Sequence, residues 1–102
     1  MSSREKALYR LRVPDEVAVL VRHLHPQVKR KVKSALKLIL SEPHAGKMLK
    51  EDLKGLLSYG VGRIRIVYRI APKRTIELIT IGPRKTIYEE TYRALKKEVE
   101  KE

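Results

Sequence analysis

The chain has 102 residues, with 24 Lys or Arg against 12 Asp or Glu, and its formal net charge is +12. This length supports one hydrophobic core, so we expect a single domain over residues 1–102; the absence of cysteine excludes disulfides, thiolate metal sites and cysteine nucleophiles. The excess positive charge predicts a polyanionic partner, with nucleic acid first and an acidic protein second.

A strand is predicted near the N-terminus. Leu8–Val13 alternates, and Tyr9 and Leu11 share one face of it. Arg10 and Arg12 interrupt this segment, so it has neither the apolar run of a signal peptide nor that of a membrane span. We therefore expect a cytoplasmic protein that does not bind membranes.

Two short helices should follow as an antiparallel hairpin. The first is expected to have Asp15 as its N-cap and to end near His25. The second should begin at Pro26 and end before Pro43. Their apolar stripes consist of Val17, Leu20, Val21 and Leu24 in the first helix, and of Val28, Val32, Ala35, Leu36 and Ile39 in the second.

The middle of the chain lacks a clear period. Residues His44–Leu57 are predicted to be a loop, which Met48, Leu49 and Leu53 attach to the core.

Two paired strands are predicted next. Arg63–Ile70 alternates between isoleucine or tyrosine and mostly arginine, which is typical of a strand in a half-buried sheet. A hairpin turn at Ala71–Arg74 leads into the β-branched run Thr75–Ile81, and Gly82 and Pro83 end the sheet.

The C-terminal segment is predicted to be a helix. From Lys85 onward, apolar side chains and one threonine recur at four-residue steps, at Ile87, Thr91, Leu95 and Val99. The order of elements predicts an α+β domain: a small antiparallel sheet with a mixed edge, an N-terminal helical hairpin and a C-terminal helix. We expect the helices on one face of the sheet and arginines on the other.

Two groups of cations are candidates for phosphate binding. No acid lies between Glu16 and Glu42, where the second helix carries Lys29, Arg30, Lys33 and Lys37. These residues form either a solvated face or a phosphate-binding one. Arg63, Arg65 and Arg69 fall on the polar side of the central strand, near Arg84. They either cover apolar atoms with their stems or converge, without nearby acids, on an anionic ligand.

We expect no metal and no cofactor. His23 and His25 point to different sides of a helix, and His44 has no companion with ligand spacing. Surface or helix-end roles explain these histidines. Neither a glycine-rich phosphate loop nor an acidic pair suited to Mg²⁺ is present.

Three segments occur in a familiar order: Leu53–Leu56, then Gly62–Ile70, then Gly82–Tyr88. The sequence resembles the RelE/ParE toxins of bacterial and archaeal toxin–antitoxin systems over nearly its whole length. The resemblance implies a ribosome-dependent endoribonuclease that cuts mRNA and is held inactive by a cognate antitoxin. We expect the antitoxin's acidic, amphipathic segment to fill an apolar groove beside the terminal helix.

The resemblance also implies site residues. Arg65 corresponds to the central-strand arginine of the nuclease members, Arg84 to their arginine after the last strand, and Tyr88 to their C-terminal tyrosine, with Tyr92 as the fallback. Tyr88 is then the general base, and the two guanidiniums clamp the phosphate. The RNA-contact set consists of Lys29, Arg30, Lys33, Lys37, Lys54, Arg63 and Arg69.

The sequence departs from the nuclease pattern at two positions. Ser58 and Gly60 stand where nuclease members often carry basic residues. This departure favours two alternatives: a non-enzymatic inhibitor of DNA gyrase, like the ParE members, or a toxin that retains only antitoxin binding. Arg63, Lys54 or Lys50 would have to supply the missing charge from neighbouring positions.

Overall fold

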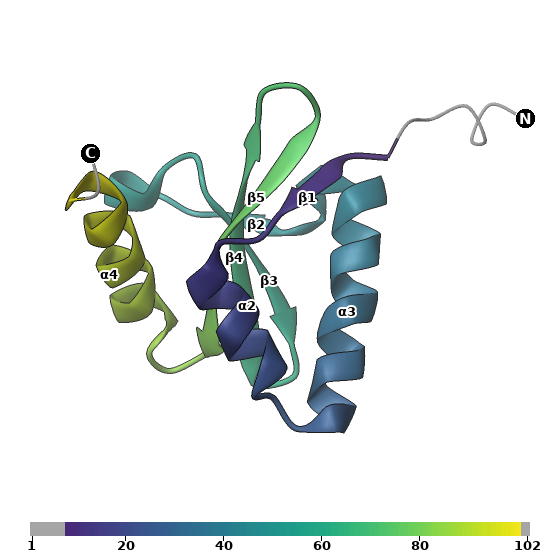
Figure 1. The fold of residues 1–102 in the computed structure, drawn as a ribbon. Coiled ribbons are helices and arrows are strands. Elements are labelled where there is room, and N and C mark those ends of the chain that lie inside the picture. The colour runs from purple at the N-terminus through teal and green to yellow at the C-terminus, as the bar shows by residue number, and fades with distance from the viewer. Residues whose placement is uncertain (1–7, 101–102) are drawn as a thin grey trace, which may run out of the picture.

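A five-stranded sheet lies between helices in the computed structural model, which describes residues 8–100 (Figure 1). In chain order the elements are β1 (Arg10–Arg12), α2 (Asp15–Arg22), α3 (Pro26–Ser41), the 3₁₀ turn η1 (Pro43–Ala45), β2 (Lys47–Met48), the 3₁₀ turn η2 (Glu51–Leu53), β3 (Leu57–Val61), β4 (Ile64–Ala71), β5 (Thr75–Pro83) and α4 (Ile87–Glu100). The predicted α+β class, with an N-terminal helical hairpin and a C-terminal helix, is confirmed.

The sheet is mixed at one edge only. Its strand order is β1-β5-β4-β3-β2; β1 runs parallel to β5, and every other neighbouring pair is antiparallel. The tight β4–β5 connection has positive φ at Lys73 (61°) and Arg74 (52°), a backbone shape that reverses the chain within a few residues. The predicted turn and strand pair are therefore confirmed.

The alternation of β4 separates two hydrophobic clusters. Ile66 and Tyr68 pack with α2 and α3 on one face of the sheet, whereas Val67 packs with Ile87 of α4 on the other. The prediction that all three helices share one face is therefore wrong. The physical reason is that both faces of β4 and β5 carry apolar residues, so both must be covered.

An irregularity in β5 contributes to the second cluster. Val67 is paired with Thr80 but Tyr68 with Leu78, so Ile79 is an extra residue in β5. Such a bulge reverses the alternation of side chains that follow it. Ile79 thus lies on the α4 face, whereas Ile81, two residues later, lies on the α3 face instead of sharing the face of Ile79.

The connection before β3 is more ordered than predicted. It contains two 3₁₀ turns and the short edge strand β2, and β3 itself begins at Leu57. Leu49 and Leu53 are buried as expected, whereas Met48 is 66% exposed and does not attach the segment to the core.

A buried tyrosine holds this connection to the sheet. Tyr68 is fully buried, and its hydroxyl donates to the Pro43 carbonyl oxygen (2.7 Å) and accepts from the Gly46 N–H (2.9 Å). An ideal Cβ atom at Gly46 would lie 2.7 Å from the Tyr68 hydroxyl oxygen, so a glycine is required for this approach. Burial raises the pKa of the Tyr68 phenol above 10, although the Gly46 N–H acts in the opposite direction.

Three expectations about the helices need correction. Pro14, not Asp15, is the N-cap of α2, and no side chain caps that helix. Leu20 and Val99, which the four-residue spacing placed on the apolar stripes of the first and last helices, are 44% and 72% exposed. Between residues 8 and 100, no helix combines the length and the apolar character needed to cross a membrane.

Candidate functional site

A small pocket opens between the edge of the sheet and the first turn of α4. Its volume is about 240 Å³, and its lining residues are Lys47, Leu49, Ser58, Arg65, Arg84, Ile87 and Tyr88. We call it the arginine pocket. The structure thus brings Arg65, Arg84 and Tyr88, the three predicted catalytic residues, to one place.

Two glycines flank Arg65 in the sheet. Arg65 is paired with Gly60 of β3 on one side and with Gly82 of β5 on the other. An ideal Cβ atom at Gly60 would lie only 2.8 Å from Arg65 Nη1. Any side chain at position 60 would therefore displace the guanidinium, so Gly60 leaves room for the site arginine.

Arg84 and Tyr88 enter the pocket from the segment between β5 and α4. The Arg84 N–H donates to the Arg63 carbonyl oxygen (2.8 Å), which ties this segment to the β3–β4 turn. Ile87 is 4% exposed and anchors the start of α4, while the neighbouring Tyr88 is 56% exposed. Because the buried Ile87 anchors the start of α4, the phenol of the next residue, Tyr88, is held at the rim of the arginine pocket.

Lys47 is a fourth polar residue that lines the arginine pocket, and the sequence did not predict it. Lys47 lies on β2 opposite Ser58, whose side chain is buried. A two-residue edge strand has no detectable period, so the sequence carried no signal for this placement. A cation therefore lines the pocket from the strand next to β3.

The cations of the arginine pocket are free of acids. Among residues 8–100, no ion pair involves Lys47, Arg65 or Arg84. These three positive charges around one exposed phenol make the pocket suited to an anion such as a phosphate group.

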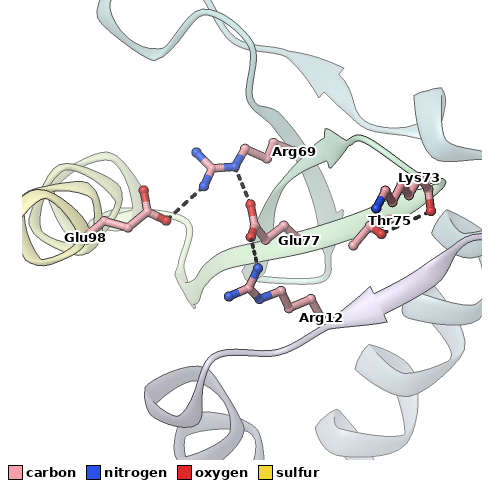
Figure 2. Close-up of polar contacts among 6 residues, drawn as sticks. All are labelled: Arg12, Arg69, Lys73, Thr75, Glu77 and Glu98. Atoms are coloured by element: carbon pink, nitrogen blue, oxygen red, sulfur yellow. Dashed lines mark hydrogen bonds and ion pairs between the residues drawn. The ribbon is translucent and has the colours of Figure 1, made fainter. Parts of the chain in front are cut away.

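Arg69 lies four residues after Arg65 on β4, but unlike Arg65 it is paired with acidic side chains. It contacts Glu77 (2.6 Å) and Glu98 (3.0 Å), and Glu77 also pairs with Arg12 (3.1 Å) (Figure 2). Partial burial acts to lower the pKa of Arg69, but the hydrogen bond and charge of Glu77, helped by Glu98, outweigh it and raise that pKa. The expectation that Arg69 faces a ligand without nearby acids is therefore wrong.

The remaining predicted RNA contacts lie away from the pocket. Arg63 is in the β3–β4 turn instead of the strand, and Lys54 ends η2 without lining the arginine pocket. Lys29, Arg30, Lys33 and Lys37 are all on α3, which packs on the other face of the sheet. The structure therefore separates the basic helix from the arginine pocket.

Two grooves accompany the basic helix. Arg30 lines a groove of about 610 Å³ against Tyr59 and Gly60 of β3. Lys33 and Lys37 flank a largely apolar groove of about 460 Å³, whose other lining residues are Leu11, Val13, Ala18, Val21, Leu36, Leu40 and Leu78. The apolar groove thus lies between α2 and α3, not beside α4.

A second hollow adjoins the arginine pocket. Its volume is about 340 Å³, and it is lined by Lys47, Met48, Leu49, Lys50, Glu51, Leu53, Tyr88 and Tyr92. We call it the tyrosine hollow. Tyr92 lines this hollow but not the arginine pocket, so Tyr88 is the tyrosine beside Arg65 and Arg84.

Two of the three histidines, His23 and His25, make local hydrogen bonds in the helical hairpin. His25 caps α3 by accepting from the Gln27 N–H through Nδ1 (3.2 Å), and His23 Nδ1 lies 2.9 Å from the Val19 carbonyl oxygen. In the part of the chain that the structure describes, no three His, Asp or Glu side chains gather as a metal site would require.

Comparison with known proteins identifies relatives of this chain. The family model described as ParE-like toxin of type II bacterial toxin–antitoxin system matches residues 11–92, and no curated protein matches the sequence. The toxin–antitoxin complex RelBE2 from Mycobacterium tuberculosis contains a chain 26% identical, with a TM-score of 0.68, covering 76% of this chain and 100% of that one.

Two further solved structures share the fold. A mutant of the Escherichia coli toxin RelE in the free state is 19% identical, with a TM-score of 0.71, covering 89% of this chain and 98% of that one. The archaeal RelE–RelB complex from Pyrococcus horikoshii has a chain 20% identical, with a TM-score of 0.63, covering 76% and 97%.

Proposed function

We propose a function from one premise: the chain belongs to the ParE-like toxins of type II bacterial toxin–antitoxin systems. On this premise, we infer that it acts in the cytoplasm as a ribosome-dependent endoribonuclease that cuts mRNA. The observation that carries the inference is the arginine pocket, where Arg65, Arg84 and Tyr88 converge beside Lys47.

The pocket contains the groups that RNA cleavage through the 2′-hydroxyl needs. Tyr88 is the general base that takes the proton of the 2′-hydroxyl, and the neighbouring guanidiniums stabilise its phenolate. Arg65 and Arg84 clamp the phosphate oxygens and stabilise the negative charge that develops in the transition state. A guanidinium holds its proton tightly and is a poor acid. As the 2′-oxygen bonds to phosphorus and the P–O5′ bond breaks, the leaving 5′-oxygen therefore takes its proton from water, and the 2′,3′-cyclic phosphate remains on the other fragment.

Ser58 and Gly60 of β3 are uncharged where nuclease members often carry basic residues, and Lys47 compensates for this difference. In this chain, Lys47 lines the pocket from β2, opposite Ser58 of β3, while the Arg65 guanidinium occupies the space above Gly60. Four groups therefore surround the phosphate without any cation on β3.

A cognate antitoxin is the expected protein partner. The similar structures from Mycobacterium tuberculosis and Pyrococcus horikoshii are toxin–antitoxin complexes. In this chain, the apolar groove between α2 and α3 has lysines only at its rim, Lys33 and Lys37. An amphipathic antitoxin segment with acidic flanks fits such a groove.

A toeprint of translating ribosomes on a defined mRNA tests the nuclease function. The wild-type chain should cut the transcript on ribosomes and leave naked RNA intact, and Arg84→Ala should abolish cutting while the protein stays folded. Undiminished cutting by Arg84→Ala, or none by the folded wild type, contradicts the proposal.

Inhibition of DNA gyrase is the second candidate. It is favoured by the absence of cations at Ser58 and Gly60 of β3 and by the ParE-like family assignment. Expression of a gyrase inhibitor should block replication and cause an SOS response with filamentation, whereas the nuclease should stop translation first. A chain that binds antitoxin but shows neither effect would be a toxin without chemistry.

A further inference from the structure

We propose that the tyrosine hollow binds a nucleobase with an exocyclic amino group, next to the phosphate held in the arginine pocket. The inference rests on the proposed function and adds a base-recognition subsite to it. Three observations carry it: the placement of the exposed aromatic side chains, the three residues that line both cavities, and one carboxylate among the lysines.

The chain exposes its aromatic side chains at this one place. It has five tyrosines and no Phe or Trp. Within residues 8–100, only Tyr88 (56%) and Tyr92 (49%) are largely exposed, and both line the tyrosine hollow. They are four residues apart on α4, which puts them on the same side of the helix. Exposed aromatic rings in RNA-binding proteins commonly stack on unpaired bases.

Met48 adds a third exposed apolar side chain. It is 66% exposed and lines the hollow from β2, opposite the tyrosines of α4. A thioether adapts its shape readily and contacts aromatic rings favourably. The volume of about 340 Å³ lies at the lower end of the range of small-molecule sites, which suits a single base.

The tyrosine hollow and the arginine pocket adjoin each other. Lys47, Leu49 and Tyr88 line both. A phosphate between Arg65 and Arg84 therefore leaves an adjoining nucleoside within reach of the hollow. Lys47 and Lys50 supply charge for the flanking backbone.

Glu51 sets the chemistry of the base. It lines the hollow and takes part in no ion pair or side-chain hydrogen bond within the described residues. Its φ of 54° is unusual for a residue other than glycine, and such conformations cluster at functional sites. A carboxylate accepts hydrogen bonds from the exocyclic amino groups of cytosine, adenine or guanine. Uracil has no amino group, and its one ring donor, N3–H, lies between two carbonyl oxygens that a carboxylate repels. The hollow should therefore disfavour uracil.

Methionine NMR tests the subsite directly because the chain has two methionines, Met1 and Met48. The probes are the 2′-O-methylated dinucleotides CpC and UpU, which cannot be cleaved, and ribose 5-phosphate, which has no base. With methyl-¹³C methionine in the intact chain, CpC should shift the Met48 signal, and a Met48→Leu variant assigns it. CpC should bind at least about five-fold more tightly than UpU.

Three outcomes overturn the subsite. The first is an unmoved Met48 signal when CpC has bound, and the second is equal affinities for CpC, UpU and ribose 5-phosphate. The third is failure of CpC to bind with a Kd below about 10 mM. Ribosome-dependent cutting that persists in any of these cases leaves the proposed nuclease function standing, so the two failures are distinguishable.

Matched variants separate base recognition from general charge. Glu51→Gln should reduce the preference for CpC over UpU to less than about two-fold, because an amide both donates and accepts. Asp52→Asn, the same change in charge one residue away and outside the hollow, should leave the preference intact. Tyr92→Leu should weaken CpC binding at least about five-fold through loss of stacking. An unchanged preference in Glu51→Gln contradicts the role of the carboxylate.

Discussion

Arg65 and Arg69 lie on the same strand and the same face of the sheet, yet their surroundings differ completely. Arg65 is flanked by Gly60 and Gly82 and faces a pocket with no acid in its lining. Arg69 is flanked by Glu77 on β5 and reaches Glu98 near the end of α4 (Figure 2). The neighbours on adjoining strands, not the residue type, decide which arginine is available to a ligand.

The comparison extends to the two ends of α4. Its first turn presents Tyr88 to the arginine pocket, whereas its last turns carry Glu98 to Arg69 and Lys97 to Glu16. One end of the helix is thus part of the site, and the other is attached by ion pairs. Paired charges hold the structure here, and unpaired ones remain for binding.

The largest expected effect separates the two arginines. Arg65→Ala should lower ribosome-dependent cutting at least about 100-fold because it removes a preorganised cation from the transition state. Arg69→Ala should leave cutting within about two-fold of wild type, since that guanidinium is already neutralised by acids. Toeprinting with both variants measures the contrast, and equal losses would show that the pairing of Arg69 does not isolate it.

The second effect tests whether Gly60 positions Arg65. Gly60→Ala should lower cutting roughly ten-fold or more by displacing the guanidinium, since a small misplacement of a catalytic group is costly. Its φ is not in the left-handed region, so the backbone tolerates alanine. In an Arg65→Ala background the same change should have almost no further effect on activity. Additive losses in this cycle would assign Gly60 a role independent of Arg65.

The third effect concerns the buried phenol that holds the segment before β2. Tyr68→Phe should lower the free energy of unfolding by about 1–3 kcal/mol, because the Gly46 N–H and the Pro43 carbonyl lose their partner. Tyr59→Phe, in a half-buried tyrosine on β3, is the control and should cost less. Urea denaturation of both variants provides the measurement.

Tyr68 also makes the free energy of unfolding depend on pH. The pKa of Tyr68 is raised in the folded state, so the unfolded chain loses its phenolic proton first, near pH 10. Stability is therefore fully present below pH 10 and falls as the pH rises above it. Tyr68→Phe should show a smaller alkaline loss of stability than the wild type, and parallel curves would rule this linkage out.

The smallest effect concerns the ion pairs made by Glu77 on β5 and by Glu98 near the end of α4. Glu77→Gln should cost about 1 kcal/mol, because Glu77 is largely buried between Arg12 and Arg69. Glu98→Gln should cost no more than about 0.5 kcal/mol, since that pair is exposed. Thermal unfolding at low and high salt checks the order, which would be reversed if Glu98 were the main anchor of α4.

Much of the fold could be predicted from local patterns. The alternation of β4, the apolar stripe of α3 and the turn before β5 each depend on residues close together in the chain. The resemblance to RelE/ParE toxins likewise drew attention to Arg65, Arg84 and Tyr88. What failed were elements without a period, above all β2, and the assignment of α4 to the same face as the helical hairpin.

The sequence by itself therefore determined the α+β order, the basic character and the family of this protein. Only the tertiary structure decided that Lys47 lines the arginine pocket, that Gly60 makes room for Arg65, and that Arg69 is bound to acids. The physical reason is that periodicity reports which residues are buried, whereas charge pairing depends on strand register and on helix placement. Those arise from contacts between segments distant in the chain, such as Lys47 with Ser58 and Arg69 with Glu98.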